Sequence, residues 1–433
     1  MRKKTAEGAQ KHRILYVVTE DWLFCLHRLP VARLARDKGF EVMVATRVGQ
    51  FGQTILDEGF TLFPIEFVRG LQNPFKECRV ILALATLINH EEPDIVHHIA
   101  LKSMIYGYVA SWFSRVPAFV NSVTGLGHVF SGRTWKILMI RRVLITVLRL
   151  ALRKGNSTVI FQNSEDQKTF GDLGLITRQR SVVIKGSGVD LEKFYPEPEK
   201  EGTPVVLLGC RLLWEKGVGE YVEAARLLKR KGVKVVCALG GILDNQNPEG
   251  ISETQIRQWE QEGSIEWWGI LENMPEVLAN VHVVVLPSYY GEGVPKFLLE
   301  GAACGRPVVT TDIRGCREVV RHGQTGLLVP PRNAKALADA IESLVGHPDL
   351  RDRMGRKGRS LVSRDFSSEK VARETVGVYE QLLKAMNNQS RPGALCEHMN
   401  PHEESALRVE SIRENLHDGK SMSHSQFGEG RAS

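Results

Sequence analysis

Residues 281–311 constrain the fold of this chain more than any other stretch. An apolar run is followed by the glycine-containing sequence SYYGEGVP, by helix-forming residues at 296–304 and by a β-branched run. Pro295 suits the first helical turn, where a missing N–H removes no hydrogen bond, and Gly305 favours the end of the helix. The pattern therefore predicts a strand, an open loop, a helix and a second strand.

Two carboxylates occur within this predicted unit, Glu292 in the loop and Glu300 inside the helix. Gly291 and Gly293 flank Glu292 and let a ligand approach the backbone closely. A helix N-terminus at the carboxyl end of a parallel strand offers free N–H groups to an anion, and carboxylates beside it can accept hydrogen bonds from hydroxyls. A nucleotide-sugar matches this layout, because its diphosphate lies between a sugar and a ribose. Isolated glutamates of this kind are otherwise solvated side chains at a helix end.

The sequence EGVPKFLLE, followed by AACGRPVV, resembles the signature of retaining glycosyltransferases of family four. The resemblance implies the GT-B fold, an α/β architecture of two facing Rossmann-like domains with a C-terminal crossover helix. It implies a catalytic role for Glu292 in orienting the donor sugar, and a role for Glu300 in holding the ribose. Gly293, Val294 and Pro295 then belong to the donor-binding loop.

Two cations and three further residues complete the predicted donor site. Arg211 and Lys216 follow an apolar strand within one loop, where they can neutralise a diphosphate and the charge of a departing one. By resemblance they match the diphosphate-binding pair of the family and act in catalysis. The resemblance also implies that Gly188 faces the donor phosphates, and that Gly269 and Leu271 lie against the nucleotide base.

Length and composition agree with this architecture. With 433 residues, of which 42% are hydrophobic, the chain can form two domains that each bury a core. The net charge of +7 favours an anionic partner. Seven cysteines without a Cys-x-x-Cys pair argue against a disulfide framework or a zinc site and favour a reducing, cytoplasmic compartment. We expect neither a signal sequence nor a transmembrane helix, since no run reaches about eighteen apolar residues.

Short apolar runs alternate with helical patterns along most of the chain, which predicts parallel sheets. The sequence DWLFCLHR, which follows the first predicted strand, is assigned to a loop. A stretch with prolines and charges at 196–204 predicts a boundary between domains. We expect five segments: a flexible N-terminus at 1–12, an acceptor-binding domain at 13–190, a donor-binding domain at 191–365, a crossover helix at 366–386 and a disordered tail at 387–433.

Four residues of the first domain are candidates for contact with the acceptor. His27 follows the first predicted strand, His97 and His98 end the strand DIVHH, and Lys102 comes shortly afterwards. The carboxyl ends of parallel strands hold the ligands of α/β proteins, although a histidine there can equally be a satisfied core residue. The run IVHHIALKSMIYG, with VNSVTGLGHVFSG, resembles the subgroup that extends polyprenyl-diphosphate-linked saccharides in capsule, O-antigen or N-glycan assembly.

Residues 133–154 contain seven basic side chains, no acidic ones and many apolar ones. This composition is typical of a helix that lies in the surface of an anionic bilayer. A long core helix with a solvated basic edge is the alternative. We expect the segment to make peripheral contact with the inner face of the cell membrane.

The expected function is retaining transfer of a hexose or an N-acetylhexosamine from a nucleotide-sugar, with UDP as the expected carrier, to a polyprenyl-diphosphate-linked acceptor. No cofactor is expected, the absence of an Asp-x-Asp pair argues against a required metal, and nucleic acid is not an expected partner. A nucleotide-sugar epimerase of the same fold and a non-catalytic sugar-binding protein are the alternatives. A NAD-dependent oxidoreductase is disfavoured, because no Gly-x-Gly-x-x-Gly follows the first strand.

Overall fold

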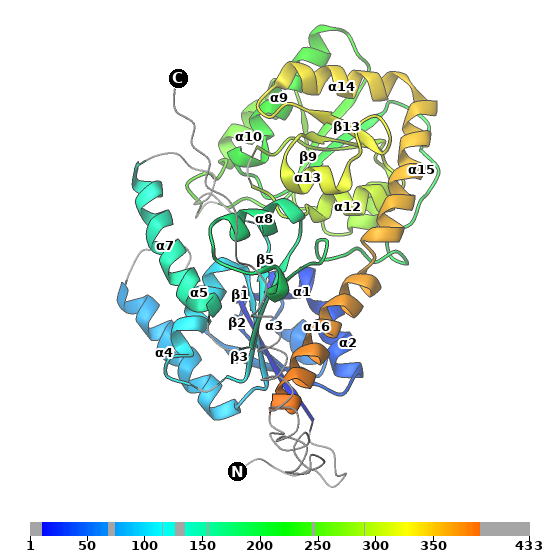
Figure 1. Ribbon diagram of the computed structural model, residues 1–433. Helices are drawn as coiled ribbons and strands as arrows, with labels where there is room; N and C mark the ends of the chain where they lie inside the picture. The colour runs from blue at the N-terminus through cyan, green and yellow to red at the C-terminus, as the bar shows by residue number, and fades with distance from the viewer. Residues whose placement is uncertain are drawn as a thin grey trace, which may run out of the picture. The chain divides into compact units, whose positions relative to one another are not determined.

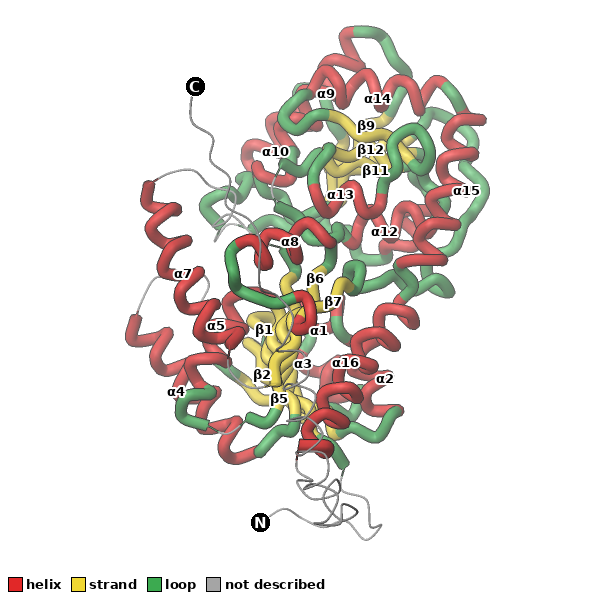
Figure 2. Tube along the Cα trace, viewed as in Figure 1, coloured by secondary structure: helices red, strands yellow, loops and turns green. Residues whose placement is uncertain are grey.

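The computed structural model of the chain describes residues 11–67, 74–114, 116–125, 135–153, 156–244, 247–289 and 291–389. Two parallel β-sheets with helices on both faces make up the described chain (Figures 1 and 2). Met1–Leu383 forms one compact unit that contains both sheets, and each sheet with its helices is called a lobe below. The two-lobed α/β fold is the one that the sequence predicted.

The sheet of the first lobe has seven strands in the described chain, in the order β3-β2-β1-β4-β5-β6-β7. Every pairing between neighbours is parallel. The strand order reverses between β1 and β4, so the loops after these two strands diverge to opposite sides and leave a crevice. The strands are β1 (Arg13–Glu20), β2 (Glu41–Arg47), β3 (Thr61–Pro64), β4 (Ile95–Ile99), β5 (Ala118–Val123), β6 (Asn156–Phe161) and β7 (Ser181–Val183).

The sheet of the second lobe has six strands in the described residues, in the order β10-β9-β8-β11-β12-β13, also all parallel. Its order reverses between β8 and β11. Apart from β10 and β13 at its two edges, its strands are almost entirely buried, which explains their largely apolar sequences. They are β8 (Val205–Gly209), β9 (Val236–Gly240), β10 (Glu266–Trp267), β11 (Val283–Leu286), β12 (Val308–Thr311) and β13 (Gly326–Val329).

Helices cover both faces of the first sheet (Figure 1). On one face, helices α4 and α5 pack against the sheet over an apolar core that includes Leu15, Met43 and Val96. The helices of the first lobe are α1 (Asp21–His27), α2 (Leu29–Asp37), α3 (Gly52–Asp57), α4 (Pro74–Glu91), α5 (Ala100–Ala110), α7 (Trp135–Arg153) and α8 (Ser164–Asp172), with a short 3₁₀ turn, η1 (Arg178–Arg180).

The second lobe has one apolar core on each side of its sheet. Side chains of α9, α10 and α14 contribute to the first core, and side chains of α11, α12, α13 and α15 contribute to the second. These elements are η2 (Trp214–Lys216), α9 (Val218–Arg230), α10 (Glu253–Gln261), α11 (Met274–Ala279), α12 (Lys296–Ala303), α13 (Arg314–Val319), α14 (Ala334–Gly346) and α15 (Pro348–Asp365).

The segment DWLFCLHR is a helix, α1, and not the predicted loop. The reason is Asp21, which is only 2% exposed and accepts hydrogen bonds from the N–H groups of Trp22, at the start of the helix, and of Gly49 and Phe51 in the loop after β2. These contacts fix the chain at the end of β1 and start the helix there. The pairing of residues far apart in sequence is not visible in local composition.

The sequence analysis assigned no element to α15, whose charged sequence contains two glycines. Gly355 explains the close packing of α15, because a Cβ at this position would lie 1.9 Å from the carbonyl oxygen of Gly305, which follows α12. At Gly358 the nearest atom to a Cβ would be the Cβ of Ala302, at 3.6 Å. Glycine, a weak helix former, is needed here so that two helices can approach.

A final helix, α16 (Ser368–Gln389), begins where the two lobes are joined a second time. Val189, in the connection from the first lobe to the second, donates its N–H to the carbonyl of Phe366 and accepts from the N–H of Ser368. The helix begins two residues later than the predicted crossover at 366–386 and extends three residues into the predicted disordered tail. Residues 1–10 of the predicted flexible N-terminus and 390–433 of the tail lie outside the described residues.

Tyr379 of α16 packs on the first lobe through polar contacts that are fully buried. Its hydroxyl lies 2.7 Å from Nδ1 of His97 and 3.2 Å from the hydroxyl of Tyr16. We expect Tyr379→Phe to lower the free energy of unfolding by about 1–3 kcal/mol, because two buried polar groups lose their partner. Urea denaturation checks this value. The matched control Tyr195→Phe, at a 53% exposed tyrosine, should change stability little, and an equal loss in both variants would contradict the expectation.

Candidate active site

The loops after β8 and β11 begin side by side at the carboxyl edge of the second sheet, because these strands are parallel neighbours. They also contact each other, since the hydroxyl of Ser288 and the N–H of Tyr289 both donate to the carbonyl of Glu215. The loop after β8 leads into η2 and carries Arg211 and Lys216, and the loop after β11 carries Glu292. Lys216 and Glu292 are 76 residues apart in sequence, yet Lys216 Nζ forms an ion pair with Glu292 Oε1. The structure therefore brings together two of the three predicted catalytic residues by direct contact.

Ser288 is a further partner of Glu292 that sequence analysis missed. Its hydroxyl lies 3.0 Å from Glu292 Oε1, and the serine is fully buried. Its carbonyl oxygen also accepts a hydrogen bond from the hydroxyl of Thr311 on the neighbouring strand β12. Glu292 is thus held by one cation and one hydroxyl, and a single carboxylate oxygen receives both.

Arg211, the third predicted catalytic residue, forms an ion pair with Asp244, in the loop after β9, at 3.3 Å. Both side chains line a cavity of about 1410 Å³. The other wall of this cavity belongs to the first lobe and includes Arg47, Lys76, Arg79 and Lys102. Glu20 and Glu66 also line it, so the cavity has five basic and three acidic side chains and walls from both lobes. Its size and its excess of positive charge suit a large anionic ligand.

Glu300 lies on α12 and is 7% exposed. Burial raises the pKa of its carboxyl from 4.5 to about 7, although the positive charges of Lys296 and Lys193 act in the opposite direction. Burial likewise lowers the pKa of Lys296, whose Nζ donates to the carbonyl of Gly188 at 3.1 Å. A carboxyl with a pKa near 7 in a ligand-binding region is a candidate functional group.

The other predicted donor-site positions lie on loops near the carboxyl edge of the second sheet. Gly188 and Gly269 have positive φ angles of 77° and 68°, which explains the glycines. Pro295 caps the N-terminus of α12. The side chain of Leu271 packs beside Gly209 and Gly240, at the ends of β8 and β9, where a Cβ would meet it at 3.2 Å and 2.6 Å.

Gly293 and Val294 reach the first lobe. The N–H of Val294 donates to Oε1 of Gln162, which follows β6, at 2.8 Å. A Cβ at Gly293 would lie 2.1 Å from the same oxygen, so only glycine permits this approach. Sequence analysis missed Gln162, and nothing in the local pattern of β6 distinguishes it.

The four acceptor-side candidates do not share one location. Lys102 lines the cavity and forms an ion pair with Glu77 at 3.5 Å. His97 and His98 are 0% and 1% exposed and do not line the cavity, so direct contact of these histidines with an acceptor there is not supported. His97, which has partners on both ring nitrogens, corresponds to the alternative of a satisfied core residue. His98 is buried as well, but its Nε2 has no hydrogen-bond partner within the described residues. His27 contacts Ser187 in the lobe connection at 2.9 Å.

Burial explains why these histidines are poor proton acceptors. It lowers the pKa of His98 to about 4 and that of His27 to about 3, and it lowers the pKa of His97 well below 6.5. His98 Nδ1 lies 2.9 Å from Oδ1 of Asn121, and His97 Nε2 lies 2.7 Å from the hydroxyl of Ser122. All three imidazoles are neutral near pH 7 and hold neighbouring elements together.

No group of three or more His, Cys, Asp or Glu side chains within the described ranges could hold a metal ion. The helices of that part of the chain also include none with the length and apolar content that crossing a bilayer requires.

Comparison with known families identifies the class of protein. Residues 13–163 match the family model "Glycosyl transferase 4-like", and residues 190–361 match "Glycosyl transferases group 1". The two matches cover the first and the second lobe, and the second includes Arg211, Lys216, Glu292 and Glu300. The chain belongs to the glycosyltransferases of the GT-B fold, in the family that the sequence signature predicted, and it is a transferase enzyme.

Individual relatives agree with this assignment. The chain is 29% identical to the N,N'-diacetylbacillosaminyl-diphospho-undecaprenol alpha-1,3-N-acetylgalactosaminyltransferase of Campylobacter jejuni, over 82% of this chain and 95% of the relative. It is 24% identical to the capsular polysaccharide biosynthesis glycosyltransferase CapM of Staphylococcus aureus, over 72% and 82% of the two chains. The crystal structure of Anabaena Alr3699/HepE in complex with UDP and glucose superposes with a TM-score of 0.70 at 19% identity, over 86% of this chain and all of that one.

The raised pKa of Glu300 predicts a pH dependence of stability. Because the folded chain holds this proton more tightly than the unfolded chain, the contribution of Glu300 to stability is most favourable below pH 4.5 and declines as the pH rises to about 7. We expect the stability of Glu300→Gln relative to the unmodified protein to increase by about 2 kcal/mol between pH 5 and pH 8. Urea denaturation at a series of pH values measures this difference.

The matched control is Glu253→Gln, which changes a glutamate with a 58% exposed side chain on α10. Its stability difference should stay constant over the same pH range. A constant difference for Glu300→Gln would contradict the raised pKa.

Proposed function

We propose that this enzyme moves a hexose or an N-acetylhexosamine from a UDP-sugar to a polyprenyl-diphosphate-linked saccharide, with retention of anomeric configuration. The contact between Lys216 and Glu292 carries the proposal, because it places a cation and a carboxylate together at the carboxyl edge of the second sheet. Arg211, in the same loop as Lys216, lines the cavity. The acceptor class is supported by the Campylobacter jejuni relative, which acts on a diphospho-undecaprenol-linked sugar. UDP is supported by the Anabaena complex.

Arg211 and Lys216 stabilise the departing nucleoside diphosphate. The bond between the anomeric carbon and the diphosphate oxygen breaks, and negative charge accumulates on that diphosphate. Two fixed cations at the switch point neutralise this charge without reorganisation during the reaction. They also replace the divalent cation that other phosphate chemistries require, so EDTA should not inhibit transfer.

Glu292 positions the donor sugar through its hydroxyl groups, and Glu300 holds the ribose. The acceptor oxygen attacks the face of the anomeric carbon from which the diphosphate leaves, and a donor phosphate oxygen takes the proton of the acceptor hydroxyl. The neutral, buried histidines are not required for this step. Precise placement of the two substrates therefore supplies most of the catalysis.

The first lobe holds the acceptor in the cavity. Lys76, Arg79 and Lys102 line it, and these side chains can neutralise the diphosphate of a lipid-linked saccharide. Trp22 and Phe67 line the same cavity and can pack against sugar rings or the first prenyl unit. We assign His27 a supporting role, because its contact with Ser187 attaches the end of α1 to the connection between the lobes.

In this proposal helix α7 binds the first lobe to the membrane surface. Its apolar side chains are partly buried on one face, where Leu148 is 0% exposed, but several others remain exposed in water. Exposed apolar groups next to arginines suit a helix that lies in an anionic bilayer surface. We place the enzyme on the inner face of the cell membrane through this surface, formed by Trp135, Leu138, Met139, Ile140, Arg142, Val143, Arg149 and Leu150.

A panel of radiolabelled nucleotide-sugars with lipid-linked acceptors tests the reaction. We expect one UDP-sugar to label one polyprenyl-diphosphate saccharide, and Glu292→Gln to reduce this transfer by a factor of about a hundred or more, because the sugar loses its carboxylate contact. The control Glu253→Gln should retain full activity. Isomerisation of the sugar without an acceptor would support the epimerase instead, and binding without turnover would support the sugar-binding protein.

Cosedimentation with vesicles tests the membrane surface. We expect the protein to bind phosphatidylcholine vesicles that contain phosphatidylglycerol better than phosphatidylcholine alone. Reversal of two charges by Arg142→Glu and Arg149→Glu should weaken binding about tenfold or more, since each basic residue near the surface contributes about 1 kcal/mol. The control pair Arg230→Glu and Arg257→Glu, exposed on the second lobe, should bind normally. Equal binding by both pairs would contradict the assignment of α7.

A further inference from the structure

The turn between β6 and α8 in the first lobe contacts the second lobe at two places. It contains Gln162 and Asn163, directly after the strand, and Glu165 and Asp166 in the first turn of α8. The side chain of Asn163 caps the helix by accepting from the N–H of Asp166 at 2.8 Å, which fixes the geometry of the turn. We call residues 162–166 the β6–α8 turn.

The first contact joins Gln162 to the donor-binding loop. Gln162 is 7% exposed, and its Oε1 accepts a hydrogen bond from the N–H of Val294, two residues after Glu292. Val294 is equally buried, so its N–H would have no access to water if Gln162 withdrew. The bond connects residues 132 positions apart and crosses from one lobe to the other.

The donor-binding loop also fits closely against the end of β5. A Cβ on Gly293 would lie 2.3 Å from the carbonyl oxygen of Thr124, and a Cβ on Gly125 would lie 3.0 Å from the carbonyl oxygen of Gly291. On the other side of the loop, Gly315 approaches so closely that its Cβ would overlap the carbonyl of Gly293. The loop that carries Glu292 is therefore enclosed between the first lobe and α13.

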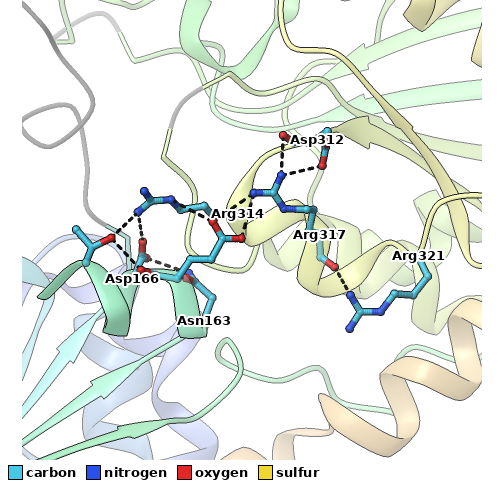
Figure 3. Close-up of polar contacts among 8 residues, drawn as sticks. Asn163, Asp166, Asp312, Arg314, Arg317 and Arg321 are labelled. Carbon is cyan, nitrogen blue, oxygen red and sulfur yellow. Dashed lines mark hydrogen bonds and ion pairs between the residues drawn. The ribbon is translucent and has the colours of Figure 1, made fainter. Parts of the chain in front are cut away.

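The second contact is a group of ion pairs between α8 and α13, shown in Figure 3. Arg314 donates to Asp166 at 3.1 Å, and Asp166 is 3% exposed. Arg317 pairs with Glu165 at 3.1 Å and with Asp312 of its own lobe at 2.9 Å. Because a buried carboxylate requires its partners, the Arg314 contact favours the lobe arrangement in which Gln162 reaches Val294.

We propose that Gln162 is a positioning residue for glycosyl transfer, which holds the donor-binding loop from the acceptor lobe. The carboxylate of Glu292 takes its working position only when the N–H of Val294 is bonded to Gln162. The Arg314–Asp166 pair stabilises the arrangement that permits this bond. The acceptor lobe thereby sets the geometry of the donor sugar, although Gln162 itself does not touch the reacting atoms. This inference rests on the proposed function, since it concerns the efficiency of that transfer.

Gln162→Leu removes the acceptor atom while keeping the size of the side chain. We expect kcat for transfer to fall by about tenfold to a hundredfold, because an unpaired buried N–H destabilises the productive loop conformation. The substrates are the UDP-sugar and lipid-linked saccharide that give the highest turnover in the panel described above. UDP affinity, measured by calorimetry, should remain unchanged, because Arg211 and Lys216 are intact. A merely structural role would lower thermal stability without lowering the kcat of the folded enzyme.

Two further substitutions separate the hydrogen bond from the fold. Gln162→Glu keeps an accepting oxygen at the same reach and should restore most of kcat. Gln162→Asn is one methylene shorter, so its oxygen cannot reach Val294, and it should lose activity as Gln162→Leu does. Unchanged kcat in both Gln162→Leu and Gln162→Asn would overturn the inference.

Gln167 is a matched control on α8. Its amide donates to the hydroxyl of Ser181 at 2.9 Å, within the first lobe. Gln167→Leu makes the same substitution but removes a hydrogen bond that lies within one lobe, so it should leave kcat unchanged. An equal loss of kcat in Gln167→Leu and Gln162→Leu would show a general effect of the lobe and would also overturn the inference.

Hydrogen exchange tests the loop without depending on activity. In the substrate-free protein, peptides covering residues 291–300 should exchange faster in Gln162→Leu than in the unmodified chain, while peptides from α9 stay unchanged. Arg314→Gln should cause a smaller increase in the same peptides. Unchanged exchange in Gln162→Leu would refute the positioning contact, whereas failure of the whole panel to show transfer would refute the proposed function and leave this measurement valid.

Discussion

The parallel pairing of β8 with β11 is the constraint on which the donor site depends. Parallel neighbours end at the same edge of a sheet, and here the strand order reverses between them. The loops that follow therefore begin side by side. One of them contains Gly217, whose Cβ would lie 2.1 Å from the carbonyl oxygen of Pro287 in the other, so the two loops are in contact. A side chain at Gly217 would separate the loops and with them Lys216 and Glu292.

The site combines stabilising contacts with costly ones. Glu292 receives a cation and a hydroxyl, which compensates for its low exposure. Glu300 is buried with weaker compensation, so its pKa rises to about 7, and burial lowers the pKa of Lys296 on the same helix. Protein interiors rarely retain such groups for stability alone. Both groups lie on α12, the helix that follows the loop of Glu292, which agrees with a role other than stability.

The histidines of β4 show how resemblance and structure differ. Their position at a strand end in the first lobe suggested contact with the acceptor, and the sequence analysis left a satisfied core histidine as the alternative. In the structure His97 joins β4 to Tyr379 of α16, and His98 joins β4 to Asn121 of β5. Side chains in a parallel sheet alternate between two covered faces, so a residue near the carboxyl edge still points into a core unless the chain turns there.

The sequence by itself determined the alternation of strands and helices and the two-lobed fold, and it predicted which residues form the donor site. Hydrophobic periodicity is local, so most strands were placed within a few residues, and the EGVPKFLLE sequence carries Glu292 and Glu300 at a spacing that one loop and one helix fix. Only the tertiary structure decided the partners: Ser288 for Glu292, Asp244 for Arg211 and Gln162 for Val294. These contacts depend on the order of the strands in the sheet and on the approach of the two lobes. A local pattern of residues encodes neither the strand order nor the approach.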